Sequence, residues 1–176
     1  CAAIDPAAYA GFNLVVGELR TGSWAWIGNR DPRHPHEAQA PRLHTRALGA
    51  GVHTVSNASL DTPWPKTQRL ADALQTALQR LDDDDAWQQP LTETLADTRP
   101  AQPHELPATG VPPDVEHALS SPFVRMPQRA YGTRSSTVLR WHADGRVQVD
   151  EWTHEPAADA PCFAPPARRR EWITVP

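Results

Sequence analysis

TPWPKTQRLADALQTALQRL, residues 62–81, is the strongest helix signal in this chain. A helix is predicted from about Trp64 to Leu81, because one continuous apolar stripe recurs at i, i+4, i+7, i+8 and i+11. The stripe consists of Leu70, Leu74, Ala77, Leu78 and Leu81. We expect Asp61 or Thr62 to cap this helix, with Pro63 or Pro65 in its first turn. The aspartates at 82–85 should end it, because like charges repel and are unfavourable at the negative end of a helix dipole.

Strand signals lie on both sides of this helix. Before it, 12–17 and 23–28 are predicted to pair as an antiparallel hairpin, and 52–57 is a third predicted strand. After it come a weaker helix at about 90–97, an irregular connection over 100–122, and strands at 137–141, 146–153 and 172–175. Asp144-Gly145 favours a tight hairpin turn between the first two of these. Strands, then helices, then strands indicate an α+β layered sandwich of antiparallel sheets.

The composition excludes several classes of protein. A length of 176 residues predicts a single domain over 1–176. We expect a soluble, cytoplasmic protein, because no apolar run is long enough for a transmembrane segment and no signal-peptide pattern is present. The net charge of −4 and the absence of a basic stripe argue against nucleic acid as a partner. Two cysteines, Cys1 and Cys162, are too few for a disulfide scaffold or a four-thiolate zinc site.

Metal, cofactor and nucleophile signals are weak. His34-Pro35-His36 with Glu37 lies in a proline-rich loop and lacks the spacing typical of a zinc site. The aspartates at 82–85 lack the alternation and glycine of a calcium loop. We expect His53 to be packed or hydrogen-bonded. Cys1 has the amine and thiol of an N-terminal nucleophile, but no rigid strand follows it. The sequence therefore predicts no metal and no cofactor, and it identifies no catalytic residue.

Three segments could bind an anion. Lys66, the only lysine, lies in the first turn of the predicted helix, where the dipole gives a cation no benefit and favours a negative ligand. Arg30 follows the second predicted strand and offers a planar fork for a carboxylate or phosphate. Hydroxyls, a glycine and an arginine concentrate in 131–137, a combination suited to an anion nest. In each case a solvated surface residue, a loop ion pair or a satisfied turn is the alternative interpretation.

Six blocks carry a family resemblance. They are YAGFNL (9–14), GNR (28–30), GVHTVSNASLDTPWPK (51–66), LPATGV (106–111), SPFV (121–124) and YGTRSST (131–137). In this order, and over nearly the whole chain, they resemble the NRDE family, which is the family of transport and Golgi organisation protein 2. Members begin Met-Cys and carry an Asn-Arg-Asp-Glu motif shortly afterwards, and neither occurs here. Asn29-Arg30-Asp31 is not this motif, because Pro32 follows it and because it lies in the later Gly-Asn-Arg block.

The resemblance implies a partial Ntn-hydrolase-like αββα sandwich. The chain looks like the C-terminal two-thirds of such a domain, and the missing N-terminal segment is expected to pack on it. The family's candidate cysteine nucleophile would lie in that segment. A homodimer is also left open. A fold does not establish a function.

The expected function is the binding or handling of a small anionic metabolite, of the acyl-coenzyme A or haem type proposed for relatives. The expected ligand-binding residues are Asn29, Arg30, Asn57, Lys66, Thr133, Arg134 and Ser135. Haem is disfavoured within this class, because no histidine or cysteine stands out as an axial ligand. The alternatives are an N-terminal-cysteine amide hydrolase and an interaction module built on the chain's seven tryptophans.

Overall fold

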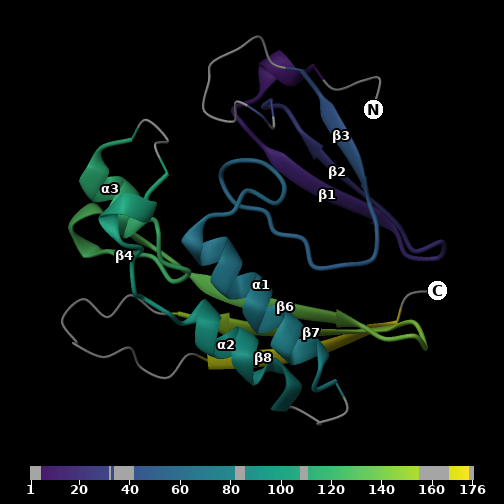
Figure 1. The fold of residues 1–176 in the computed structure, drawn as a ribbon. Helices are drawn as coiled ribbons and strands as arrows, with labels where there is room; N and C mark the ends of the chain where they lie inside the picture. The colour runs from purple at the N-terminus through teal and green to yellow at the C-terminus, as the bar shows by residue number, and fades with distance from the viewer. Residues whose placement is uncertain are drawn as a thin grey trace.

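The structure is a computed structural model that describes residues 5–31, 33, 42–81, 86–107, 111–154 and 167–174. It contains two three-stranded sheets, one two-stranded sheet and three α-helices among these residues, and every strand pairing is antiparallel. The N-terminal sheet lies above α1, and the C-terminal sheet lies behind α1 and α2 (Figure 1). The predicted α+β class with antiparallel sheets is confirmed.

The N-terminal sheet has the order β1-β2-β3. β1 (Asn13–Glu18) and β2 (Ser23–Gly28) form the predicted hairpin. The third strand was predicted at 52–57, and this is wrong: β3 is His44–Leu48. The backbone at Thr54 is occupied elsewhere, because its N–H donates to the Asp61 carboxylate (3.0 Å) and its carbonyl accepts from the Asp61 N–H (2.7 Å). These bonds close a loop over 54–61 in place of a strand pairing.

The long helix forms where the leucine periodicity predicts it, with different ends. α1 is Pro65–Leu78, so it ends before Leu81. Its N-cap is Trp64, in place of the predicted Asp61 or Thr62. The Trp64 N–H donates to the hydroxyl of Thr67 (3.0 Å), which itself donates to the Thr62 carbonyl (2.9 Å). The predicted aspartate stop lies outside the described residues.

The region after α1 contains more regular structure than predicted. α2 is Gln89–Leu95, close to the predicted second helix. The connection predicted to be irregular contains α3, Pro113–Ala118, so that prediction is wrong there. β4 (Arg125–Met126) and β5 (Tyr131–Gly132) form the two-stranded sheet. Four 3-10 turns complete the described elements: η1 Pro6–Ala8, η2 Ala86–Gln88, η3 Pro103–Glu105 and η4 Pro127–Arg129.

The C-terminal sheet has the order β6-β7-β8 and is covered on one face by α1 and α2 (Figure 1). Its strands are β6 (Ser135–Trp141), β7 (Arg146–Thr153) and β8 (Ala167–Thr174), as predicted apart from their ends. The core between helices and sheet consists of Ala73, Ala77, Trp87, Leu91 and Val138, with Leu74, Leu81, Leu95 and Trp152 packed against it. Leu74, Ala77 and Leu81 of the predicted stripe therefore pack toward this sheet, whereas Leu78 is 48% exposed, so the stripe is narrower than predicted.

A buried ionic cluster ties β7 to β8. Asp150 is fully buried and accepts hydrogen bonds from Arg168 Nε (3.0 Å) and Arg170 Nε (2.7 Å). Burial alone would raise the pKa of Asp150, but the hydrogen bonds from Arg170, Gln148 and Arg168 outweigh it and lower that pKa. The charged carboxylate is therefore part of the folded state.

The outer face of the C-terminal sheet is open among the described residues, with apolar residues at one end and the charged Glu151, Arg169 and Glu171 at the other. Leu139 is 63% exposed and Ile173 is 51% exposed. On the other sheet, Leu14, Val15 and Val16 are exposed along β1. Among the described residues, no helix combines the length and the apolarity that crossing a membrane requires.

Candidate functional site

A cavity of about 310 Å³ lies where the N-terminal sheet, the start of α1 and α3 meet. Its volume is at the lower end of the range of small-molecule sites. Its charged and polar wall contains Arg30, Asn57, Lys66, Glu116 and Ser120. Three of these, Arg30, Asn57 and Lys66, were predicted from the sequence, and the structure brings them together.

Asn13 fixes the loop that carries Asn57. Its amide nitrogen donates to the carbonyls of Ser56 (2.9 Å) and Ala58 (2.8 Å), which flank Asn57. Its amide oxygen accepts from Nε1 of Trp26, which is 3% exposed (2.9 Å). One side chain thus satisfies two loop carbonyls and a buried indole, which explains why the Gly-Phe-Asn and Ser-Asn-Ala blocks meet at the cavity.

Asn29 lies behind the cavity wall. It is 3% exposed and does not line the cavity. Its amide oxygen accepts from the Phe12 N–H (2.8 Å), and its amide nitrogen donates to the carbonyls of Pro6 (3.1 Å) and Ala10 (3.0 Å). Asn29 therefore holds the segment before β1 in place, and it contributes to the site by positioning Gly11 and Phe12.

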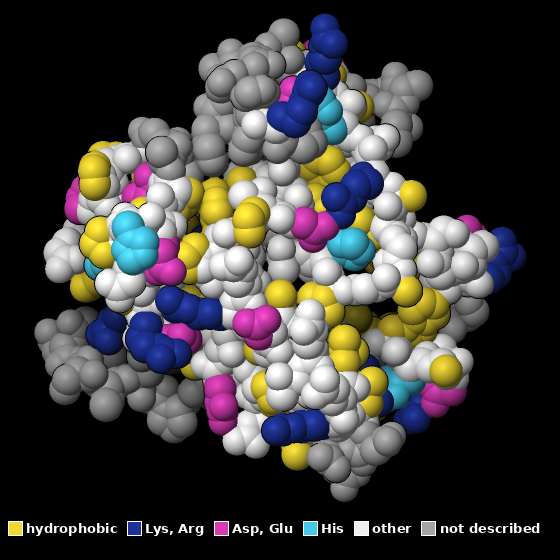
Figure 2. Space-filling view, in the orientation of Figure 1, with side chains coloured by type: hydrophobic (Ala, Val, Ile, Leu, Met, Phe, Trp, Pro, Cys, Tyr) yellow, Lys and Arg dark blue, Asp and Glu magenta, His cyan; other side chains and the backbone are white. Residues whose placement is uncertain are grey.

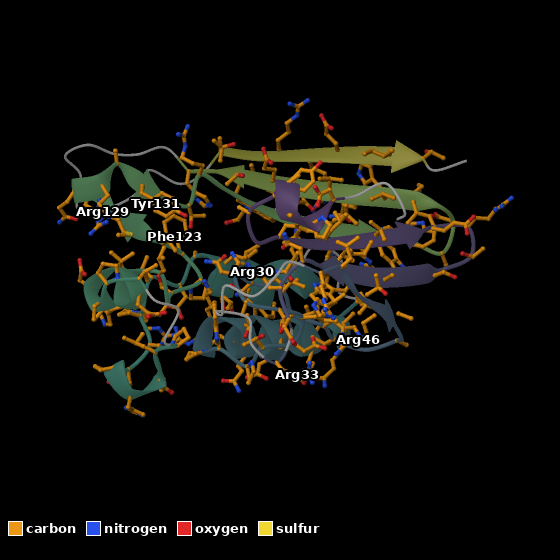
Figure 3. All side chains as sticks on the ribbon, turned by 90° about the horizontal axis from the view of Figure 1, so that it is seen from above. Arg30, Arg33, Arg46, Phe123, Arg129 and Tyr131 are labelled. Atoms are coloured by element: carbon orange, nitrogen blue, oxygen red, sulfur yellow. The ribbon has the colours of Figure 1, made fainter. Side chains whose placement is uncertain are left out.

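Arg30 crosses the backbone at Gly11. A Cβ at Gly11 would lie 2.7 Å from Arg30 Nε, a distance that no side chain tolerates without movement. The glycine therefore leaves room for the guanidinium to lie along the cavity wall. Figure 3 shows Arg30 apart from Arg33 and Arg46.

Lys66 enters the cavity from the first turn of α1. Its Nζ donates to the carbonyl of Leu119 (3.1 Å) and lies 5.5 Å from the centroid of the Trp64 ring. Burial lowers the pKa of Lys66, because a desolvated ammonium favours its neutral form. The positive end of the α1 dipole adds to this cost. An anion in the cavity would offset both.

The other predicted cluster lies elsewhere. Thr133 accepts from the Val124 N–H (3.0 Å) and donates its own N–H to the Val124 carbonyl (2.9 Å), which joins β5 to the segment before β4. The carbonyl of Arg134 accepts from the His154 N–H (2.8 Å), and Ser135 begins β6. Thr133, Arg134 and Ser135 do not line the cavity that holds Lys66.

Sequence reasoning missed the α3 side of the cavity. Glu116, 9% exposed, comes from α3 itself. Ser120 follows α3, and its hydroxyl accepts from the Ala101 N–H (2.8 Å) and donates to the His117 carbonyl (2.6 Å). The missed signal was Pro113 followed by Asp114, because proline at the first helical position and acidic residues in the first turn mark a helix start.

The apolar wall contains Phe12, Trp64, Val111 and Leu119. The cavity thus offers charge on one side and an apolar contact surface for the body of a small ligand. On the face drawn in Figure 2, arginine and lysine side chains form separate groups with other residues between them. That face shows no continuous basic surface of the kind that binds nucleic acid.

Metal-binding clusters are absent from the described part of the chain. His53 is hydrogen-bonded as expected: its Nδ1 lies 3.1 Å from Oδ2 of Asp61, which also pairs with Arg46. The His34–Glu37 segment, the aspartates at 82–85 and both cysteines lie outside the described residues. The predictions for these residues therefore stay predictions.

Two comparisons with known proteins cover most of the chain. The sequence profile of the family described as Transport and Golgi organisation 2 matches residues 3–156. The chain is also similar to the human protein named Transport and Golgi organization protein 2 homolog, with 30% identity over 154 residues. That alignment covers 81% of this chain and 50% of the human protein, so the chain spans about half the length of this relative.

Proposed function

The chain belongs to the Transport and Golgi organisation 2 family, and we propose that its cavity binds the anionic group of a small metabolite. One observation carries the proposal: Arg30 and Lys66, which are 36 positions apart in the sequence, line the same cavity. Like charges repel, so two cations lining a partly desolvated cavity favour a ligand that neutralises them. Asn57 adds an amide that can donate to the same group.

A phosphate or carboxylate is the chemistry that fits this wall. Arg30 supplies a fork of N–H donors and Lys66 a single ammonium, which together match the several oxygens of a phosphate. Among the residues that the structure describes, no histidine, cysteine, methionine or tyrosine lines the cavity. The described wall therefore offers no axial ligand for haem, and a phosphate-bearing metabolite of the acyl-coenzyme A type is favoured over haem.

We also propose that a further segment packs against the two three-stranded sheets. The exposed apolar side chains, among them Leu139 and Ile173 on one sheet and Val15 on another, offer a surface for a packing partner. We assign that role to the expected N-terminal segment, because the chain spans half of its human relative. Such packing would complete an αββα sandwich. The homodimer and the cytoplasmic location stay predictions.

The amide-hydrolase alternative depends on a cysteine nucleophile in the expected segment outside this chain, and no described feature of the cavity favours it over binding. A binding experiment therefore comes first. We would titrate the 176-residue chain with butyl phosphate, which has one anionic group and a short apolar tail. Binding would be followed by calorimetry and by amide NMR shifts.

The expected result is shifts at Asn57 and at the start of α1, with affinity reduced about tenfold or more by Arg30→Gln or Lys66→Met, because a hydrogen bond to a charged group contributes about 1.5–3 kcal/mol. Arg134→Gln is the matched control and should bind as the wild type does. Shifts confined to 133–135, or unchanged affinity in both cavity variants, would overturn the proposal.

A further inference from the structure

We infer that the ligand of this cavity is a zwitterion, with a protonated amine beside its anionic group, and that Glu116 binds the amine. The inference rests on the proposed function, since it concerns the same cavity. It adds a second recognition element of opposite charge. The observation behind this inference is that Glu116, a buried residue of α3, lines the same cavity as Arg30 and Lys66.

The position of Glu116 is set by α3 and the turn after it. α3 ends at Ala118, and the next residue, Leu119, accepts the hydrogen bond from Lys66 Nζ. The Ser120 hydroxyl fixes that turn against Ala101. Glu116 therefore lies one helical turn from the contact that anchors Lys66, on an element held to the same wall.

The charged side chains of this wall do not all have the same sign. Arg30 and Lys66 attract an anion, whereas Glu116, 9% exposed on the same cavity, attracts a cation. A carboxylate with two oxygens accepts up to four hydrogen bonds, so Glu116 can bind an ammonium in addition to contacts within the protein. A ligand that carries an amine beside its anionic group can therefore contact both kinds of charge on this wall.

The volume of the cavity limits the chemical class of the ligand further. A volume of about 310 Å³ holds a small headgroup, and the wall of Phe12, Val111 and Leu119 offers apolar contact for a short carbon chain. The ligand class is therefore an ω-aminoalkyl phosphate or carboxylate, in which a few methylene groups separate the two charges. A free metabolite and the headgroup of a larger molecule share this chemistry.

The test compares amines with matched compounds that lack the amine. Calorimetry on the 176-residue chain would use 2-aminoethyl, 3-aminopropyl and 4-aminobutyl phosphate against ethyl, propyl and butyl phosphate. We expect at least one amine to bind about tenfold or more tightly than its partner, because an added charge-assisted hydrogen bond has this order of effect. Glu116→Gln should remove the preference and leave the alkyl phosphates binding at least as well as before.

Each outcome decides between the two proposals. Equal affinity for every amine and its alkyl partner in the wild type would overturn the zwitterion and leave the anion site standing. A preference that survives Glu116→Gln would also overturn it. Failure of all six probes to bind would overturn the proposed function itself. If Glu116→Gln lowers the melting temperature too far for calorimetry, Glu116→Asp keeps the charge and shortens the reach, and it should move the preference toward a longer amine.

Discussion

Replacing Asn13 by alanine should destabilise the protein and loosen the cavity at the same time. The side chain makes three hydrogen bonds: two to the carbonyls on either side of Asn57 and one from the buried Nε1 of Trp26. Alanine removes all three and leaves the Trp26 N–H without this partner. The loop that presents Asn57 loses its connection to β1.

The expected loss follows from these contacts. A hydrogen bond contributes about 1 kcal/mol net, so three give about 3 kcal/mol in the free energy of unfolding. For a domain of this size that corresponds to a fall of roughly 6–12 °C in melting temperature. Asn13→Asp should cost at least as much, because a second carboxylate oxygen would face the two loop carbonyls. Val15→Thr, on the exposed surface of the same strand, is the matched control and should change stability by less than about 0.5 kcal/mol.

Urea unfolding measures the first effect, and amide NMR with butyl phosphate titration measures the second. The reasoning requires both: a loss near 3 kcal/mol, and altered resonances at Ser56–Ala58 with weaker binding. A loss below about 1 kcal/mol for Asn13→Ala would refute the hydrogen-bond argument. A full loss of stability with unchanged Asn57 resonances and unchanged affinity would refute the link between Asn13 and the site.

Three further predictions concern single residues. Gly11→Ala should weaken butyl phosphate binding several-fold in calorimetry, because its Cβ would displace Arg30; unchanged affinity would show that Arg30 does not act from this position. Asp150→Asn should cost about 3 kcal/mol in urea unfolding, because two partly exposed arginines of β8 lose their buried carboxylate; a cost below 1 kcal/mol would contradict the ionic cluster. Burial lowers the pKa of His154 below its ordinary value of 6.5, so protonation favours the unfolded chain, and stability should fall as the pH is lowered from 6.5. His154→Gln should flatten that slope, and His117→Gln, at an exposed position, should not.

Much of the fold follows from local patterns in the sequence. The leucine stripe predicts α1 because one face of that helix packs on the C-terminal sheet. Asp144-Gly145 predicts the β6–β7 hairpin because the turn needs the positive φ that Gly145 adopts. The 52–57 segment misled, since a short stretch rich in β-branched residues after Gly49 and Gly51 is typical of a strand. Its Thr54 backbone bonds to Asp61, a loop contact between residues seven positions apart that hydrophobic periodicity does not encode.

The site was predictable only in part, because local sequence patterns mark single residues and do not specify how distant segments pack. Lys66, Arg30 and Asn57 each stand beside a local signal, namely a helix start, a strand end and a loop. The distance between Lys66 and Glu116, by contrast, depends on how α3 packs, and no local pattern specifies it. Thr133 resembles an anion-binding loop in composition, and the structure uses its hydroxyl to bond Val124. Polar residues thus line a cavity in one part of the chain and connect backbone segments in another.

The central claim is that Arg30 and Lys66 hold one anion between them, and a crystal structure of the 176-residue chain with butyl phosphate tests it most directly. The account predicts the phosphate inside the cavity, within hydrogen-bonding distance of both side chains and close to Asn57. A phosphate bound only at Thr133–Ser135, or bound in the cavity without contact to Lys66, would contradict it.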